Sequence, residues 1–299
     1  MPTIAIIDSN NLLFRAFYAV PLLSTSTGIH TNGIYGSLKS FRSIVNELKP
    51  DYILACFDSG KKSFRNTLDP NYKAHRPPVA NELKTQFSLL QMAFSLLGVP
   101  QMTAGPNIEG DDLTGTIAMK ASNAGIDVVI VSSDKDFYQL CNEHIKVWSF
   151  TKAKKFGDGM VDANYVRQEF GVNPNQLNCV KSLTGEKTDG IQGVKGIGPK
   201  TATALIQQYG TVNNLLKYLE SNPNHKNYTI YENKNIVNLA FDLATIRTNV
   251  EIEEVLILPV DKIKVNGEKL RAFFKKLEMN SFIEEFARWE FLFNYKTTV

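Results

Sequence analysis

Three short apolar runs in this 299-residue chain each lead into an aspartate, and this repeated pattern constrains the fold most. The runs are Thr3 to Ile7, Tyr52 to Phe57 and Val128 to Val131, and a fourth apolar run covers Ile145 to Phe150. They alternate with segments of helical periodicity such as Ile34 to Leu48. Alternating strands and helices predict an α/β protein with a mostly parallel central sheet and helices on both faces.

The acids that follow these runs are expected at one edge of the sheet. Sites in open α/β sheets lie beyond the carboxyl ends of the strands, where Asp8, Asp58 and Asp134 would fall. Glu109 and Asp111 would join them from the start of a helix. A single such acid is commonly a turn residue or a helix cap. Five at one edge predict a metal site instead.

The charge around these acids indicates which metal. Residues 105 to 136 contain six acids and two lysines, a net charge of −4, so a cation is expected among them. Oxygen ligands without a nearby histidine or cysteine favour Mg²⁺ or Mn²⁺ over zinc.

A basic insertion interrupts the alternation of strands and helices between Ser59 and Gly105. Residues 60 to 84 contain six basic and two acidic side chains, a net charge of +4. A solvated surface loop would explain such a run. However, the insertion leaves the sheet after Asp58 and returns before Glu109, which predicts a basic lid over the acids and an anionic substrate between them. Tyr72, between such basic groups, suits single-stranded nucleic acid.

The second half contains a glycine-rich loop, Thr184 to Pro199, between predicted helices at Pro174 to Leu183 and Lys200 to Tyr209. Closely spaced glycines before a helix can bind phosphate oxygens. The stretch GVKGIGPKTA is typical of a helix–hairpin–helix that grips one DNA backbone without reading bases. A tight interhelical turn is the alternative. Glu186 and Asp189 lie within this loop, within reach of the metal site.

Composition excludes little. The net charge of +3 predicts no partner, and Cys56, Cys141 and Cys179 show no CxxC spacing, as expected for buried thiols in a reducing compartment. No apolar run approaches the ~18 residues of a membrane span, and no basic leader precedes an apolar stretch. We expect a cytoplasmic monomer without membrane contact.

Taken together, these stretches resemble the 5′→3′ exonuclease and flap endonuclease family, which includes the N-terminal nuclease region of bacterial DNA polymerase I and stand-alone phage enzymes. The matching stretches run in the family's order from Ile6 to Ala202, and they are IIDSNNLLFRAFYA, FDSGKKSFR, NYKAHRPP, IEGDDLTGTIA, SSDKDFYQL and TGEKTDGIQGVKGIGPKTA. No polymerase region follows, so a stand-alone member is expected.

The resemblance implies a PIN-like nuclease domain at residues 1–158, with a helical arch at about 60–105, and a helical DNA-binding region at 159–299. It also implies two Mg²⁺ sites in which Mn²⁺ can substitute. The first set of ligands is Asp8, Asp58, Glu109 and Asp111. The second set is Asp134, Asp136, Glu186 and Asp189, with Asp112 nearby.

The same resemblance implies how DNA is held. Arg15, Lys73 and Arg76 would hold and activate the scissile phosphate, and a free 5′ strand would thread the arch, which carries Tyr72 and Arg65. Residues 31–36, including Tyr35, would form a loop at the duplex junction. The helix–hairpin–helix at about 174–209 would bind the downstream duplex, with a K⁺ held by loop carbonyls. Its expected contact residues are Gly193, Lys195, Gly196, Gly198 and Lys200.

One position departs from the pattern. Bacterial and phage members usually have Asp where this chain has Glu186, and Asn where it has Gly190. Because Glu is one methylene longer, we expect the second site to fill only at raised Mg²⁺, and Glu186→Asp to lower that requirement. Alternatively, the backbone has shifted to fit Glu186, and the shorter Asp would fall short.

The sequence therefore predicts a two-metal phosphodiesterase that acts on 5′ flaps, 5′ ends and RNA primers in replication and repair, leaving 5′-phosphate and 3′-hydroxyl ends. Two alternatives remain. A topoisomerase-type metal fold would need a transesterifying tyrosine and no basic arch. A non-catalytic or weakly catalytic protein that binds branched DNA would bind flaps without Mg²⁺-dependent cleavage.

Overall fold

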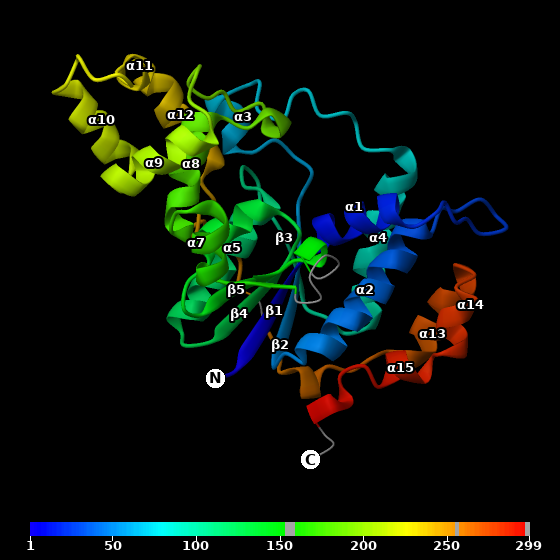
Figure 1. The fold of residues 1–299 in the computed structure, drawn as a ribbon. Helices are drawn as coiled ribbons and strands as arrows, with labels where there is room; N and C mark the ends of the chain where they lie inside the picture. The colour runs from blue at the N-terminus through cyan, green and yellow to red at the C-terminus, as the bar shows by residue number, and fades with distance from the viewer. Residues whose placement is uncertain (153–158, 255–256, 297–299) are drawn as a thin grey trace.

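A single six-stranded sheet forms the centre of the molecule, in the order β3-β2-β1-β4-β5-β6 (Figure 1). The computed structural model describes residues 1–152, 159–254 and 257–296. The strands are β1 Thr3–Asp8, β2 Tyr52–Phe57, β3 Gln101–Thr103, β4 Asp127–Val131, β5 Ile145–Trp148 and β6 Met160–Val161. All neighbouring strands are parallel except β5 and β6. The predicted α/β fold with a mostly parallel sheet is therefore confirmed.

The register of β1 determines where the acids meet. Asp8 pairs with Cys56 on β2, and Ile7 pairs with Val131 on β4. The chain segments that follow β2 and β4 therefore leave the sheet on either side of Asp8. Since successive strand residues point to opposite faces, Ala5 and Ile7 contribute to one hydrophobic core while Ile4 and Ile6 contribute to the other.

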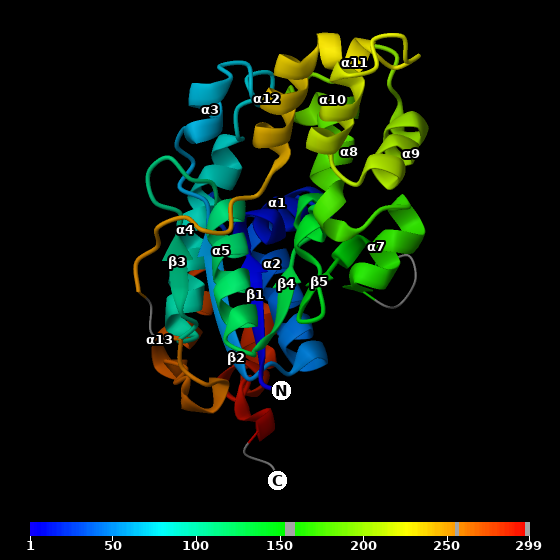
Figure 2. The same cartoon turned by 90° about the vertical axis from the view of Figure 1, so that its left-hand side faces the viewer.

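Helices cover both faces of the sheet. On one face lie α1 (Ser9–Ala19), α2 (Asn32–Leu48) and α4 (Asn81–Leu96), whose buried side chains share a core with the sheet. The opposite face is covered by α5 (Gly110–Asn123). Figure 2 shows α5 in front of β1, with the green-to-orange helices of residues 177–244 beyond the upper ends of the strands.

The insertion at 60–105 divides into two parts that differ from a continuous arch. Its first part carries the short helix α3 (Phe64–Leu68) and a turn-rich segment reaching residue 76. Its second part belongs to the fold itself, because α4 buries Leu90 and Phe94 in the core and β3 pairs with β2. Only the first part is therefore placed to act as a lid.

The chain after β6 forms a helical region with its own core. Its helices are α7 Ala163–Phe170, α8 Leu177–Thr184, α9 Pro199–Tyr209, α10 Val212–Glu220, α11 Thr229–Glu232 and α12 Lys234–Ala244, and short 3-10 turns cover Pro174–Gln176 and Lys187–Asp189. A further 3-10 turn, Lys135–Leu140, lies between β4 and β5. No helix within the described ranges is long and apolar enough to cross a membrane.

The last helices return to the first core. They are α13 Gly267–Lys276, α14 Asn280–Glu284 and α15 Ala287–Glu290, flanked by 3-10 turns at Val260–Lys262 and Asn294–Lys296. Phe274, Phe282 and Trp289 are buried there together with α2 and α4 side chains. In Figure 1 these red helices lie at the opposite end of the molecule from α9 to α11. The predicted division at residues 158/159 stays a prediction.

Candidate active site

A cavity of about 1230 Å³ lies at the carboxyl ends of β1, β2 and β4. It brings together most of the predicted site residues from both halves of the chain. Those that line it are Asp8, Asp58, Arg65, Tyr72, Lys73, Arg76, Glu109, Asp111, Asp134, Asp136, Glu186 and Asp189. Arg15 and Asp112 do not line it. Instead, the Arg15 guanidinium lies 5.0 Å from the centre of the Phe150 ring.

Four of the acids, Asp8, Asp58, Asp111 and Asp134, form what we call the strand-edge cluster. Backbone groups and hydroxyls fix them in place. The Asp8 carboxylate accepts from the Asn11 N–H at 3.0 Å and from the Ser132 hydroxyl at 2.8 Å. The Asp58 carboxylate accepts from the N–H groups of Gly110 and Gly60. None of the four forms an ion pair with a residue in the described ranges.

Burial, with added repulsion between the acids, raises the pKa values in this cluster. Desolvation, with added repulsion from Asp134 and Asp58, raises the pKa of Asp8 to about 6. Desolvation followed by the charges of Asp8 and Asp134 raises the pKa of Asp111 well above its usual value. The pKa of Asp134 is raised in the same direction by desolvation and by Asp136. Carboxylates that resist ionisation together form a site that fits a hard divalent cation.

The second group, Asp136, Glu186 and Asp189, is called the loop cluster. Each offers a carboxylate oxygen, and these oxygens lie within 4.8 Å of one another. Lys181 pairs with Asp136 and, at 2.7 Å, with Glu186. Arg76 pairs with Asp189 at 2.5 Å. Glu186 therefore reaches the cluster as it stands, which favours the alternative in which the loop is fitted to the longer side chain.

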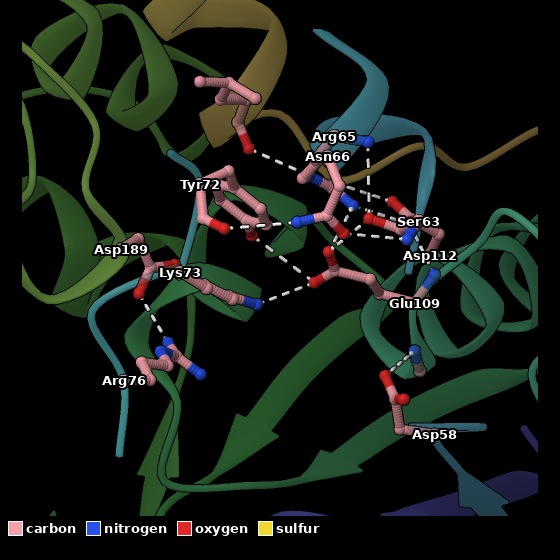
Figure 3. A network of polar contacts seen from close by, with 12 residues as sticks. Asp58, Ser63, Arg65, Asn66, Tyr72, Lys73, Arg76, Glu109, Asp112 and Asp189 are labelled. Atoms are coloured by element: carbon pink, nitrogen blue, oxygen red, sulfur yellow. Dashed lines mark hydrogen bonds and ion pairs between the residues drawn. The ribbon is translucent and has the colours of Figure 1, made fainter. Parts of the chain in front are cut away.

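Lys73 connects the lid to Glu109 (Figure 3). Its ammonium donates to Glu109 Oε2 at 2.7 Å, and the Ser63 hydroxyl donates to Oε1 at 2.7 Å. Burial raises the pKa of Glu109, but Lys73 and Arg65 outweigh it, so the pKa ends below its usual value. Burial lowers the pKa of Lys73, but Glu109 raises it further, so Lys73 remains charged.

Arg65 and Asp112 form a buried pair, and their predicted contacts with DNA and metal stay predictions. Arg65 is 3% exposed and Asp112 is fully buried. The two form a bidentate ion pair at 2.7 and 2.8 Å, and Arg65 also donates to the carbonyls of Leu243 and Thr245. The Asp112 carboxylate accepts in addition from backbone N–H groups of Glu109 and Arg247. Their charged groups are engaged with each other and with the backbone, although Arg65 also lines the cavity.

The two aromatic residues are also placed differently from the prediction. Tyr72 is 4% exposed and packs with Ile191 and Leu243, so it offers no open face for base stacking. Tyr35 lies in the first turn of α2 instead of a loop, and its ring stacks on Phe282 at 4.7 Å. Burial was not visible in the sequence because tyrosine occurs both in cores and at surfaces.

The glycine-rich loop separates into exposed and packed positions. Lys195, Gly196, Gly198 and Lys200 are exposed, and Pro199 begins α9, as the predicted helix–hairpin–helix requires. Gly193 is different, since a Cβ there would meet backbone atoms of Thr184 at 2.3 Å. Gly193 therefore allows two chain segments to pack closely.

Four site residues were missed from the sequence. Lys181 holds two loop-cluster acids, as described above. Asn10 accepts from the Asp58 N–H at 2.9 Å, Asn11 accepts from the Ser133 N–H at 3.0 Å, and Ser132 donates to Asp8. These side chains tie β1, β2 and β4 together at the site. The polar residues directly after each strand were the available signal.

Comparisons with known proteins identify the family of the chain. The family model "5'-3' exonuclease, N-terminal resolvase-like domain" matches residues 3–171, and "5'-3' exonuclease, C-terminal SAM fold" matches residues 172–271. Fold and site thus define a metal-dependent nuclease class built on a resolvase-like sheet. The chain belongs to the 5′–3′ exonuclease family.

The relatives include whole proteins and parts of longer ones. The chain is 32% identical to a 5'-3' exonuclease of Aquifex aeolicus over 95% of both chains. It is 36% identical to DNA polymerase I of Bacillus caldotenax over 94% of this chain, but it spans only 32% of that relative's length.

Solved structures share the fold. The bacteriophage T5 D15 flap endonuclease, in a complex with DNA and metal ions, superposes with a TM-score of 0.67 at 22% identity, covering 93% of this chain and 98% of that one. The catalytic core of Rad2 with DNA substrate gives a TM-score of 0.59 at 16% identity, covering 92% and 87%.

Proposed function

We propose that this protein is a structure-specific, metal-dependent 5′ nuclease that hydrolyses phosphodiester bonds at 5′ flaps and 5′ ends of DNA. The observation that carries the proposal is the cavity in which the strand-edge cluster and the loop cluster lie together with Lys73 and Arg76 of the lid. Such a cavity suits a phosphodiester held between cations and basic side chains. The relative from Aquifex aeolicus bears the name of a 5'-3' exonuclease, which supports the same activity.

The residues divide the work. Asp8, Asp58, Glu109 and Asp111 would hold one divalent cation, and the loop cluster with Asp134 would hold the other, Mg²⁺ by preference with Mn²⁺ as a substitute. Bound cations of this kind activate the attacking water and stabilise the leaving oxygen. Lys73 and Arg76 would neutralise negative charge on the phosphate, provided each leaves the carboxylate it contacts here.

DNA binding would rest on the part of the glycine-rich loop that lies outside the cavity lining. The exposed Lys195 and Lys200 suit a duplex backbone, and a K⁺ at the loop carbonyls would reinforce that grip. RNA–DNA hybrids at primers are the second expected substrate. The protein would act in replication and repair as a cytoplasmic monomer.

One assay tests the proposal. A 5′-labelled flap and a blunt duplex of the same sequence are incubated with the protein in Mg²⁺, and in parallel with a chelator. We expect cleavage of the flap near its junction in Mg²⁺ only. Tight flap binding without cleavage in Mg²⁺ or Mn²⁺ would instead identify a junction-binding protein, and equal cutting of both DNAs would exclude structure specificity.

A further inference from the structure

The base of the lid is seated on the loop that carries two loop-cluster acids. The Lys73 N–H donates to the Asp189 carbonyl at 2.9 Å, and the Arg76 side chain contacts both the carbonyl of Thr188 and the carboxylate of Asp189. Figure 3 shows Lys73 and Arg76 on either side of Asp189. Residues 71–76 of the lid and residues 186–190 of the loop therefore meet backbone to backbone.

The contact between residues 71–76 and residues 186–190 holds Lys73 in an unusual backbone conformation. Lys73 has φ +55°, in the left-handed region that residues other than glycine rarely occupy. Such a conformation persists only where the surroundings fix it. The bond to Asp189 and the turn bonds from Ala74 to Asn71 and from Arg76 to Lys73 supply that fixation. From this backbone position the Lys73 ammonium reaches Glu109.

Gly190 makes the close approach possible. It has φ +73°, and a Cβ at this position would lie 2.8 Å from the Asn71 carbonyl oxygen and 3.4 Å from the His75 ring. Neither the carbonyl of Asn71 nor the glycine backbone can move alone, because the neighbouring Lys73–Asp189 bond joins the same two segments. Gly125, by contrast, has φ +76° with nothing within 4 Å of its Cβ position.

We propose that Gly190 is a positioning residue for the reaction. It allows residues 71–76 to pack against the loop at residues 186–190, and this packing orients the Lys73 side chain into the cavity. This proposal rests on the proposed function, because it assigns the aim of Lys73 a part in cleavage. It makes the lid cation and the loop cluster one positioned unit, although they lie more than 100 residues apart in the chain.

Two variants and a matched control test this role. Gly190→Asn adds a side chain that tolerates the left-handed region best among non-glycine residues, so it isolates the clash with Asn71. Gly190→Ala adds a Cβ together with backbone strain. Gly125→Ala adds the same backbone strain in open space, away from the cavity lining.

We expect both Gly190 variants to cleave a saturating flap at least about tenfold more slowly in single turnover, since a misplacement of about 1 Å can cost 10²-fold. Flap affinity should change by less than about threefold, because phosphate contacts elsewhere provide it. Gly125→Ala should lose thermal stability but cleave at the wild-type rate. If Gly190→Ala does not fold, the cleavage rate and flap affinity of Gly190→Asn alone test the proposal.

A second measurement needs neither DNA nor a divalent cation. Hydrogen exchange at the amides of residues 71–76 should be faster in both Gly190 variants than in the wild type and unchanged in Gly125→Ala. Unchanged exchange, or faster exchange with wild-type cleavage, would overturn the proposal. A wild-type protein that does not cleave flaps would instead refute the proposed function. The exchange result would still show whether Gly190 is needed for residues 71–76 to pack against the loop.

Discussion

The strand-edge cluster and the loop cluster both consist of carboxylates, but they differ in how the negative charge is compensated. Asp8, Asp111 and Asp134 face one another without ion pairs from the described residues, and their pKa values rise. The loop-cluster acids are paired with Lys181 and Arg76. Buried like charges without partners are costly, whereas paired acids are already compensated.

If each cluster binds a divalent cation as proposed, the difference predicts two modes of binding. A cation entering the strand-edge cluster relieves repulsion directly. A cation entering the loop cluster competes with Lys181 and Arg76 for the same oxygens. The second mode releases Arg76, a lid residue, and so couples occupancy of the loop cluster to a free basic group beside the substrate.

The largest effect should come from removing one acid of each cluster together. Asp134→Asn with Asp136→Asn should abolish cleavage, a loss beyond the roughly 10²–10³-fold of a single transition-state donor. Flap affinity should remain, because phosphate contacts elsewhere supply it. Single-turnover cleavage and a binding titration in Ca²⁺ measure both. Turnover within about tenfold of wild type would show that these acids are not metal ligands.

Lys73 lies between the clusters, and its removal ranks next. Lys73→Ala should slow single-turnover cleavage by roughly 10²-fold, the range of an electrostatic transition-state group. Its effect on the dissociation constant should be smaller. Lys84→Ala, also on the cavity lining, serves as a matched lysine control. A change in affinity alone would make Lys73 a positioning contact for DNA.

The burial of Asp8, with added repulsion from Asp134 and Asp58, predicts a pH dependence of stability. Because the folded pKa of Asp8 is raised from 3.8 to about 6, its contribution is fully present below about pH 4 and is lost as pH rises through 6. The free energy of unfolding of Asp8→Asn, taken relative to that of the wild type, should therefore rise between pH 4 and 7 by on the order of 3 kcal/mol. Urea unfolding with a chelator measures this gain. If the difference in unfolding free energy between Asp8→Asn and the wild type does not change with pH, the folded pKa of Asp8 is not raised.

The loop cluster offers two opposite changes. Lys181→Met removes the competing cation and should tighten metal binding by about tenfold, as one nearby charge contributes a few kcal/mol at most near a surface. Glu186→Asp shortens a fitted ligand and should weaken it. Calorimetric titration with Mn²⁺ and Mg²⁺ in the absence of DNA compares the two. Tighter binding by Glu186→Asp would restore the expectation that Glu186 is misplaced.

The smallest effect lies outside both clusters. Lys195→Ala with Lys200→Ala should weaken binding to flaps of unrelated sequence by similar factors. It should also flatten the slope of log affinity against log salt by roughly 2, since each lost phosphate contact removes about one released counterion. The cleavage rate of the bound flap should not change. An unchanged slope would place this loop away from DNA.

The sequence was informative where structure follows from local pattern. Strand-end acids such as Asp8 and Asp58 were predictable, because parallel strands place their carboxyl ends at one edge. The start of α9 at Pro199 was predictable from proline's preference for the first helical turn.

The sequence was uninformative where a side chain's role depends on its partner. Arg65 and Lys73 stand in the same basic run, yet Arg65 pairs with the fully buried Asp112 whereas Lys73 pairs with Glu109 on the cavity lining. Charge pattern alone cannot separate them, because pairing is decided by segments such as 243–247 that lie far away in the chain. Lys181 was missed for the same reason.

The return of α13 to α15 onto the first core affects how the protein is made. Phe274 and Trp289 are buried in one core with side chains of α2 and α4, and α13 packs against α4. During synthesis α2 and α4 leave the ribosome long before residues 267–290 are translated. The apolar surface that these last helices cover is therefore exposed until then. Although domains generally fold from the N-terminus onward during synthesis, here the first segments translated are among the last to be fully packed.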